Sequence, residues 1–232
     1  MKKIGFIGAY DKTDFILYIA KIITEMNKTV LVIDTTITQK AKYVVPVINP
    51  TKTYFTEYEK IDVAVGFNSL KEMRDYLGLD DSVELNYDYV LIDVDSPEKF
   101  KDFNMENASV NYFVTSFDLY SLKRGLEALS GLQEKQKMIK VLFTKYMSSE
   151  ENEYLDFLSA NYNIEWSKDK ICFPLEQGDQ TAIMENQRVA KIKLRNLSAQ
   201  YRDNLLIMVS QITENSNLSE LRKILKNIEK GV

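Results

Sequence analysis

The hydrophobic residues of this chain fall into short continuous runs, and these runs alternate with segments of helical periodicity. Continuous runs are typical of strands that are covered on both faces of a sheet. The predicted strands are residues 3–8, 29–34, 62–65, 89–94, 111–115, 139–144 and 171–173. The predicted helices between them are residues 12–26, 69–77, 118–131 and 149–161. This alternation predicts an α/β fold: a doubly wound, mostly parallel sheet with helices on both faces.

Two further regions lie outside this alternation. Residues 43–58 are the least periodic part of the chain, and we predict an extended segment at the edge of the sheet. Its aromatic side chains have two interpretations, since they either cover the sheet edge or form a surface for a partner. The chain ends in two predicted helices, 198–213 and 218–230. We therefore expect one domain over residues 1–213, followed by an amphipathic helical extension over residues 214–232.

Composition narrows the class of protein. With 232 residues and 45% hydrophobic content, the chain can bury one full core. Its net charge of −4 gives no overall attraction to nucleic acid. The absence of histidine removes the commonest general base and zinc ligand, and the single cysteine, Cys172, is interpreted as a small core hydrophobe. Without a recognisable signal peptide or an apolar run of membrane-spanning length, we expect a cytoplasmic protein.

The segment after the first predicted strand has the order of a phosphate-binding loop. Gly8 opens a turn, Lys12 and Thr13 follow, and a helix begins at once. In such loops, glycines let backbone N–H groups approach the phosphates, while the Lys-Ser/Thr pair contacts phosphate and magnesium. Asp11 takes the place of the glycine expected before the lysine. The candidate cofactor-binding residues are Gly8, Ala9, Tyr10, Asp11, Lys12, Thr13 and Asp14.

Several segments together resemble the MinD/ParA-type ATPases, a family of P-loop NTPases with a deviant Walker phosphate loop. The stretch from Ile7 to Asp14 aligns with the family's loop, Lys-Gly-Gly-x-Gly-Lys-Thr-Thr. Residues 87–97 resemble the Walker B strand, with Asp93 in the metal-facing position and Asp95 nearby. Other similar segments, in the family's order, are residues 30–36, residues 114–119 leading to Gly125, and residues 173–176 followed by Asn186. The resemblance implies ATP and Mg²⁺ as cofactors if any bind, with Thr13 and Asp93 as the metal residues.

The same alignment shows departures from the family. Ile7 stands where a signature lysine reaches the partner's nucleotide across an ATP-sandwiched dimer. Thr36 replaces the second aspartate of an Asp-x-Asp motif that helps to position the attacking water. Asp11 and Asp14 add carboxylates beside the expected phosphates. A unit charge about 4 Å from a phosphate charge is worth roughly 4 kcal/mol at an effective dielectric near 20. Two such charges oppose most of the roughly 8 kcal/mol behind micromolar affinity.

These departures predict a degenerate phosphate loop in a pseudo-ATPase. No bound cofactor is our first expectation, and we assign no catalytic residue. Lys12 has three interpretations: a phosphate anchor, a partner for the Asp11 carboxylate, or a solvated residue in the first helical turn. Ile7 and Tyr10 place apolar groups where the family has charged ones, which predicts a dimer face that needs no nucleotide.

The resemblance implies a role in a bacterial machine for division, partition, pilus formation, secretion or conjugation. The protein would act as a localisation or assembly factor through protein-protein surfaces, and a homodimer is one such assembly. The alternatives are an active ATP-dependent switch and a non-specific DNA-binding partition factor. The DNA alternative depends on a basic cluster, for which a solvated helix face is the other explanation. The cluster comprises Arg188, Lys191, Lys193, Arg195 and Arg202.

The last predicted helix carries an apolar stripe with basic residues beside it. Asn217 or Ser219 is the expected cap at its start. The helix resembles the membrane-targeting helix of MinD, so three alternatives stay open: packing on the domain, contact with a membrane surface, or docking to a partner helix. Membrane contact would place the protein at the inner face of the cell membrane. The stripe consists of Leu218, Leu221, Ile224, Leu225 and Ile228.

Overall fold

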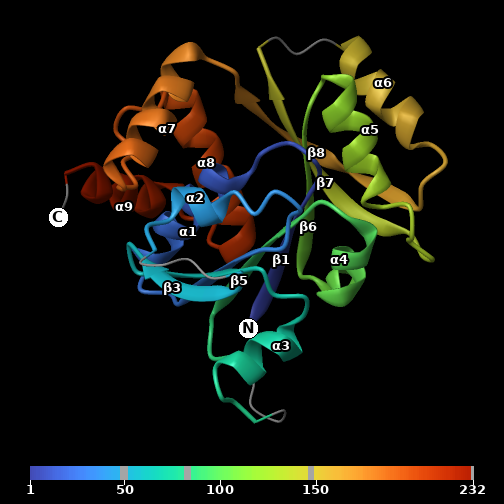
Figure 1. Ribbon diagram of the computed structural model, residues 1–232. Coiled ribbons are helices and arrows are strands. Elements are labelled where there is room, and N and C mark those ends of the chain that lie inside the picture. The colour runs from blue at the N-terminus through green and yellow to red at the C-terminus, as the bar shows by residue number, and fades with distance from the viewer. Residues whose placement is uncertain (48–51, 81–84, 146–148, 231–232) are drawn as a thin grey trace.

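One sheet organises the part of the chain that the computed structural model describes, residues 1–47, 52–80, 85–145 and 149–230. It has eight strands in the order β3-β4-β2-β5-β1-β6-β7-β8 (Figure 1). Strand β3 is antiparallel to β4, and the other neighbouring strands are parallel. The strands are β1 (Lys2–Ile7), β2 (Val30–Asp34), β3 (Tyr54–Tyr58), β4 (Ile61–Val65), β5 (Tyr89–Val94), β6 (Val110–Ser116), β7 (Gln136–Thr144) and β8 (Ile164–Pro174).

Helices cover both faces of the sheet and enclose two hydrophobic cores, which confirms the predicted doubly wound α/β class (Figure 1). Successive side chains of β1 enter opposite cores, since Phe6 packs with the first and Ile7 with the second. Over the first core lie α1 (Thr13–Thr24), α7 (Gln177–Val189), α8 (Ala199–Thr213) and α9 (Leu218–Lys230). Over the second lie α3 (Leu70–Tyr76), α4 (Pro97–Asp102), α5 (Leu119–Glu127) and α6 (Ser149–Ser159). Two short helices, α2 (Ala41–Val44) and the 3₁₀ helix η1 (Met105–Asn107), complete the set.

Side-chain caps fix where several of the predicted helices begin. Ser69 accepts a hydrogen bond from the Glu72 N–H at 3.1 Å, and Asp118 accepts one from the Ser121 N–H at 2.9 Å. Asn217 caps α9 in the same way through the Glu220 N–H. Each cap satisfies a backbone donor that has no partner inside the helix. The expected starts of these helices are therefore confirmed.

The largest differences from prediction lie at the two sheet edges. Strand β8 begins at Ile164, well before the predicted residue 171. The prediction missed its first half because the side chains there are mostly polar and partly exposed. The predicted edge segment at 43–58 contains strand β3, but its beginning belongs to α2, and residues 48–51 lie outside the described residues. Edge strands have one open side, so their sequences lack the continuous apolar run of central strands.

The C-terminal helix packs on the domain. Leu221 and Leu225 are buried in the first core, and Ile224 and Ile228 pack against it, while Leu218 is 41% exposed. Packing on the domain is thus the alternative that the structure shows, and contact with a membrane or a partner helix stays a prediction. Among the described residues, no helix combines the length and apolar character that crossing a membrane requires.

Candidate functional site

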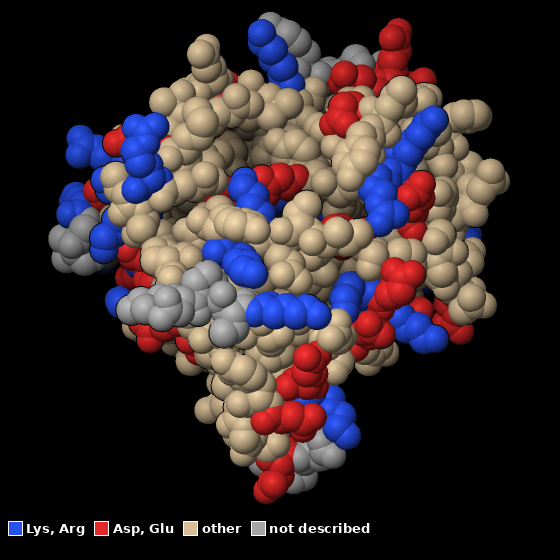
Figure 2. Space-filling model, viewed as in Figure 1, with Lys and Arg blue, Asp and Glu red and all other residues tan. Residues whose placement is uncertain are grey.

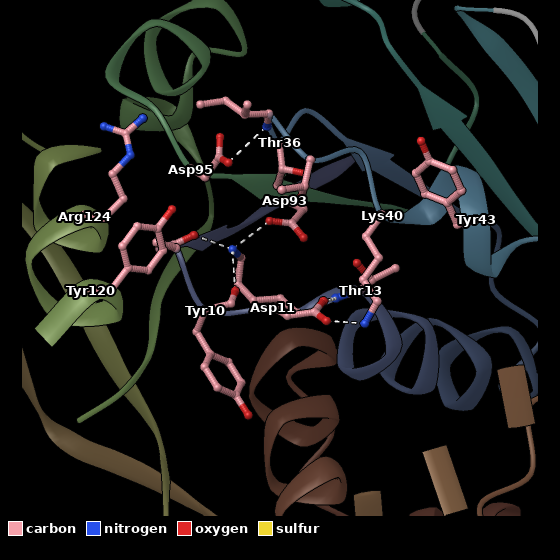
Figure 3. A pocket seen from close by; sticks show the side chains of 15 residues that line it. Tyr10, Asp11, Thr13, Thr36, Lys40, Tyr43, Asp93, Asp95, Tyr120 and Arg124 are labelled. Atoms are coloured by element: carbon pink, nitrogen blue, oxygen red, sulfur yellow. Dashed lines mark hydrogen bonds and ion pairs between the residues drawn. The ribbon is translucent and has the colours of Figure 1, made fainter. Parts of the chain in front are cut away.

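A cleft of about 430 Å³ lies at the carboxyl end of the central strands (Figure 3). Strands β1, β2 and β5 are adjacent and parallel, so the segments that follow them meet at one edge of the sheet. Helix α5 closes the opposite side with Tyr120 and Arg124. The lining residues are Gly8, Ala9, Tyr10, Asp11, Lys12, Thr13, Thr36, Ile37, Thr38, Lys40, Tyr43, Asp93, Asp95, Tyr120 and Arg124.

The turn of the loop depends on Gly8. Its φ of 141° lies in a region that residues with a side chain rarely adopt. A Cβ at this position would lie 2.2 Å from the Val114 carbonyl oxygen, which is too close. Gly8 also donates its N–H to the Val94 carbonyl at 2.9 Å. The expected turn after β1 is therefore present, held between β5 and β6.

The ammonium group of Lys12 is turned inward. Its Nζ lies 2.8 Å from Oδ1 of Asp93 and also donates to the carbonyl oxygens of Gly8 and Tyr10. Lys12 is 2% exposed and Asp93 is 3% exposed, so this is a buried ion pair. Of the alternatives for Lys12, pairing with Asp11 is not observed, because the carboxylate across the cleft on β5 takes that place. Asp93 is thus the counter-charge of the loop lysine in this structure.

Burial also changes the acidity of the carboxyl groups at this edge. Desolvation raises the pKa of Asp93 to about 7, the neighbouring Asp34 and Asp95 charges act in the same direction, and the Lys12 charge opposes them. Desolvation likewise raises the pKa of Asp34 above its usual range. Near neutral pH, the Asp93 carboxyl is therefore close to gaining a proton.

Asp11 and Asp14 share a cation that comes from a different part of the chain. Lys40, between β2 and α2, forms an ion pair with Asp11, and its Nζ lies 3.6 Å from Asp14 Oδ2. Gln187 on α7 donates a further hydrogen bond to Asp14 at 2.7 Å. Burial lowers the pKa of Lys40, but the hydrogen bond and charge of Asp11 more than offset this, and the pKa is raised. The loop carboxylates therefore hold a side chain of the protein itself.

The hydroxyl of Thr36 and the backbone N–H of Thr13 also form local hydrogen bonds. The Thr36 hydroxyl donates to Asp34 Oδ1 at 2.6 Å, and the Thr36 N–H donates to the same oxygen at 3.0 Å. The Thr13 N–H donates to Asp11 Oδ1 at 3.2 Å. Asp34 additionally accepts the Ala41 N–H at 2.9 Å, which ties the start of α2 to β2. Asp34 serves as a structural anchor at this edge, and Thr36 completes its set of donors.

The predicted dimer face stays a prediction, and its residue Ile7 does not lie at the surface. Its side chain is fully buried in the second core, because the last residue of β1 still points into the sheet packing. Tyr10 is partly buried and stacks on Phe143, with ring centroids 4.6 Å apart. Burial raises the pKa of its phenol to about 12. Ile7 therefore presents nothing to a second copy, and Tyr10 packs mainly within its own chain.

These residues do not fit a tightly bound magnesium triphosphate. Three acidic and three basic side chains line the cleft, so it offers no excess of positive charge to a polyphosphate. Lys12, Lys40 and Asp93 already have charged partners within the protein. Thr13 and Asp93 line the same cleft, but Asp93 faces an ammonium group.

The basic cluster considered for DNA does not lie on one helix face. Its explanation as a solvated helix face is therefore wrong. Arg188 lies near the end of α7 and Arg202 on α8, with an irregular segment between the two helices. Lys191 pairs with Glu59 at 3.3 Å, and Arg202 pairs with Glu229 of α9. Figure 2 shows basic and acidic side chains interspersed over the described part of one face of the molecule. The charges of this cluster are thus partly neutralised within the protein.

Sequence reasoning missed Lys40, Tyr120 and Arg124. Lys40 lies in a polar stretch without a recognisable motif, and the other two lie on a helix that the sequence identifies only as an amphipathic element. A weak signal exists for Tyr120, since it is an aromatic residue two positions after the helix cap Asp118. Only the sheet order brings these residues to the loop.

Comparison with solved structures finds similar folds. A chain of the MinC:MinD cell division protein complex of Aquifex aeolicus has a TM-score of 0.57 and 14% identity, and the match covers 93% of this chain and 97% of that chain. The MinD cell division protein of Aquifex aeolicus has a TM-score of 0.52 and 12% identity, and the match covers 93% of this chain and 98% of that chain. The pNOB8 ParA bound to nonspecific DNA has a TM-score of 0.52 and 15% identity, and the match covers 93% of this chain and 99% of that chain.

Sequence comparison adds no relative. No protein-family model matches the chain, and no curated protein matches it. At 12–15% identity, the structural similarity concerns the fold and not the chemistry. The chain has the fold of the MinD and ParA-type P-loop ATPases.

Proposed function

We propose that this protein is a pseudo-ATPase with the MinD/ParA fold that works through protein-protein surfaces. The observation that carries the proposal is the buried contact between Lys12 and Asp93 at 2.8 Å. The lysine expected to hold a phosphate and the aspartate expected to face the metal neutralise each other. Asp11 and Asp14, paired with Lys40, add carboxylates where phosphates would lie.

The proposed role is that of a localisation or assembly factor for a bacterial machine of division, partition, pilus formation, secretion or conjugation. Support comes from the fold, which is shared with a cell division protein and a ParA. A fluorescent fusion in the native cells tests this role: discrete or polar foci are expected. A uniform distribution that persists at low expression contradicts it.

A second candidate, an ATP-dependent switch, is favoured by one observation: the turn at Gly8 and the Lys12-Thr13 pair are retained. Thermal unfolding with and without Mg-ATP separates the two. A ligand at 100 times its dissociation constant adds about 2.7 kcal/mol, or about 5–10 °C for a domain of this size. The proposal predicts a rise below about 1 °C at millimolar Mg-ATP.

Two variants make this measurement decisive. Asp11→Gly combined with Asp14→Thr removes two carboxylates and should increase the response to Mg-ATP, because both charges oppose phosphate. Lys12→Ala is the matched control, since it removes the one phosphate-binding cation that the fold retains. A rise of several degrees in the unmodified protein, lost in Lys12→Ala, contradicts the proposal. Single-turnover hydrolysis above background would contradict it as well.

A further inference from the structure

Exposed hydrophobic side chains gather at the mouth of the cleft. Ile37 is 70% exposed, Tyr43 is 81% exposed and Tyr120 is 71% exposed, and all three line this cleft. Figure 3 shows Tyr43 and Tyr120 on opposite sides, with Asp93 and Asp95 between them. Large exposed hydrophobic groups that surround one polar hollow are typical of a surface that binds another molecule.

The charges inside this rim are paired, with one exception. Lys12 pairs with Asp93, Lys40 pairs with Asp11, and Arg124 pairs with Glu127 at 2.8 Å. Asp95 is the carboxylate of the cleft that has no ion pair among the described residues. Its charge is therefore available to a cation from outside.

The two oxygens of Asp95 differ. Oδ2 accepts the Ile37 N–H at 3.0 Å, whereas Oδ1 is buried and has no hydrogen-bond partner in the described part of the chain (Figure 3). A carboxylate has about four acceptor positions, so Oδ2, whose contact with the Ile37 N–H is exposed, can accept a further hydrogen bond from a ligand. The unpaired carboxylate and its apolar surround thus favour a cationic donor.

We infer that the cleft binds an arginine side chain of a partner protein, with its guanidinium group at Asp95. A guanidinium group is a planar cation with several donors, and it stacks on aromatic rings such as those of Tyr43 and Tyr120. Apolar residues that flank the arginine would contact Ile37 and the two tyrosines. The inference rests on the proposed function, because a nucleotide in the cleft would occupy the same space.

Arg124 is the internal competitor for this position. The hydrogen bond that Arg124 donates to Glu127 is the main cause of the raised pKa of Arg124, and the charge of Asp95 contributes as well. Arg124 thus lies within the field of Asp95 while it bonds to Glu127. Replacing Arg124 with glutamine removes a competing cation, so it should strengthen binding of an external arginine.

The probe is an N-acetylated tripeptide amide of leucine, arginine and leucine, titrated against the full chain and followed by amide and tyrosine NMR shifts. The matched peptide has citrulline in place of arginine, which keeps the shape but removes the charge. The arginine peptide should perturb signals at the cleft in the millimolar range, and the citrulline peptide should bind at least about tenfold more weakly. Asp95→Asn should weaken the arginine peptide by a similar factor, and Arg124→Gln should tighten it.

Asp102→Asn is the control variant, since Asp102 is an exposed aspartate on α4 outside the cleft. It should bind like the unmodified protein. Equal binding of both peptides, perturbation away from the cleft, or undiminished binding by a folded Asp95→Asn variant would overturn the inference. If the arginine peptide does not bind and Mg-ATP does not raise the melting temperature, the inference fails but the pseudo-ATPase proposal stands. A nucleotide response together with peptide binding would reject that proposal alone.

Discussion

The cleft and the C-terminal helix bury long side chains by different means. In the cleft, Lys12 and Asp93 are buried as an ion pair, each dependent on the other. On α9, Leu221 and Leu225 are buried in hydrocarbon against α1 and α8. Apolar burial scales with area and needs no particular partner, whereas a buried charge is tolerated only beside its counter-charge. The two regions should therefore respond differently to substitution, pH and salt.

The largest effect is expected for Lys12→Ala. Removing one partner leaves the Asp93 carboxyl buried without its counter-charge, and the free energy of unfolding should fall by about 3–5 kcal/mol. Urea unfolding measures the loss. The double variant Lys12→Met with Asp93→Leu is the control and should be much closer to the unmodified protein. A loss below about 1 kcal/mol in Lys12→Ala would show that the pair contributes no more than a surface ion pair.

Leu221→Ala should lower the free energy of unfolding by about 3 kcal/mol, because it leaves a cavity in the first core. Leu218→Ala is the matched control on the same helix and should change stability by less than about 0.5 kcal/mol, since Leu218 is 41% exposed. Urea unfolding at low and high salt should give the same difference. Equal losses at the two positions would contradict the observed packing of α9.

Stability should fall as the pH rises from 5 to 8. The folded pKa of Asp93 is raised to about 7, above its unfolded value, so the folded state holds the proton more tightly. This contribution is fully present below the unfolded pKa and is lost as the pH passes through about 7. Between pH 5 and pH 8 the loss amounts to about 3 kcal/mol. The free energy of unfolding, measured at several pH values, should fall more steeply with pH in the unmodified protein than in Asp93→Asn. Parallel pH profiles of the two proteins would refute the raised pKa of Asp93.

The smallest effect is expected for Lys40→Ala. Lys40 and Asp11 are partly exposed, so solvent screens their ion pair, and the loss should be about 0.5–1 kcal/mol. The loss should decrease further at high salt. Thermal unfolding at two ionic strengths measures both effects, with Lys42→Ala, a neighbouring lysine on α2, as the control. A loss that is large and independent of salt would mean that the pair behaves like a buried one.

Local patterns were sufficient for much of the fold and for the place of the site. Continuous apolar runs identified the central strands, and the order strand, Gly8, Lys12, Thr13 and helix located the cleft. The edges were less predictable, because the polar residues of β8 do not form an apolar run. Helices α4 and α7 were missed, since the mean hydropathy of such polar segments resembles that of loops.

The partners of the site residues were not predictable in this way. The sequence suggested Asp11 as a partner for Lys12, but the sheet places Asp93, on the neighbouring parallel strand β5, against the ammonium group. Lys40 reaches Asp11 across 29 positions of sequence. The burial of Ile7 in the second core was also not foreseen, because the direction of a side chain at the end of a strand depends on the sheet register.

The sequence by itself determined the α/β class, the phosphate-loop frame and the amphipathic character of α9, since these depend on periodicity and on local backbone preferences. Only the tertiary structure decided which charges meet, which hydrophobic face is covered and which side chains stay exposed at the cleft. Ion pairs form between atoms a few ångströms apart whatever their distance in sequence, and their strength depends on burial. The topology of the sheet sets both quantities.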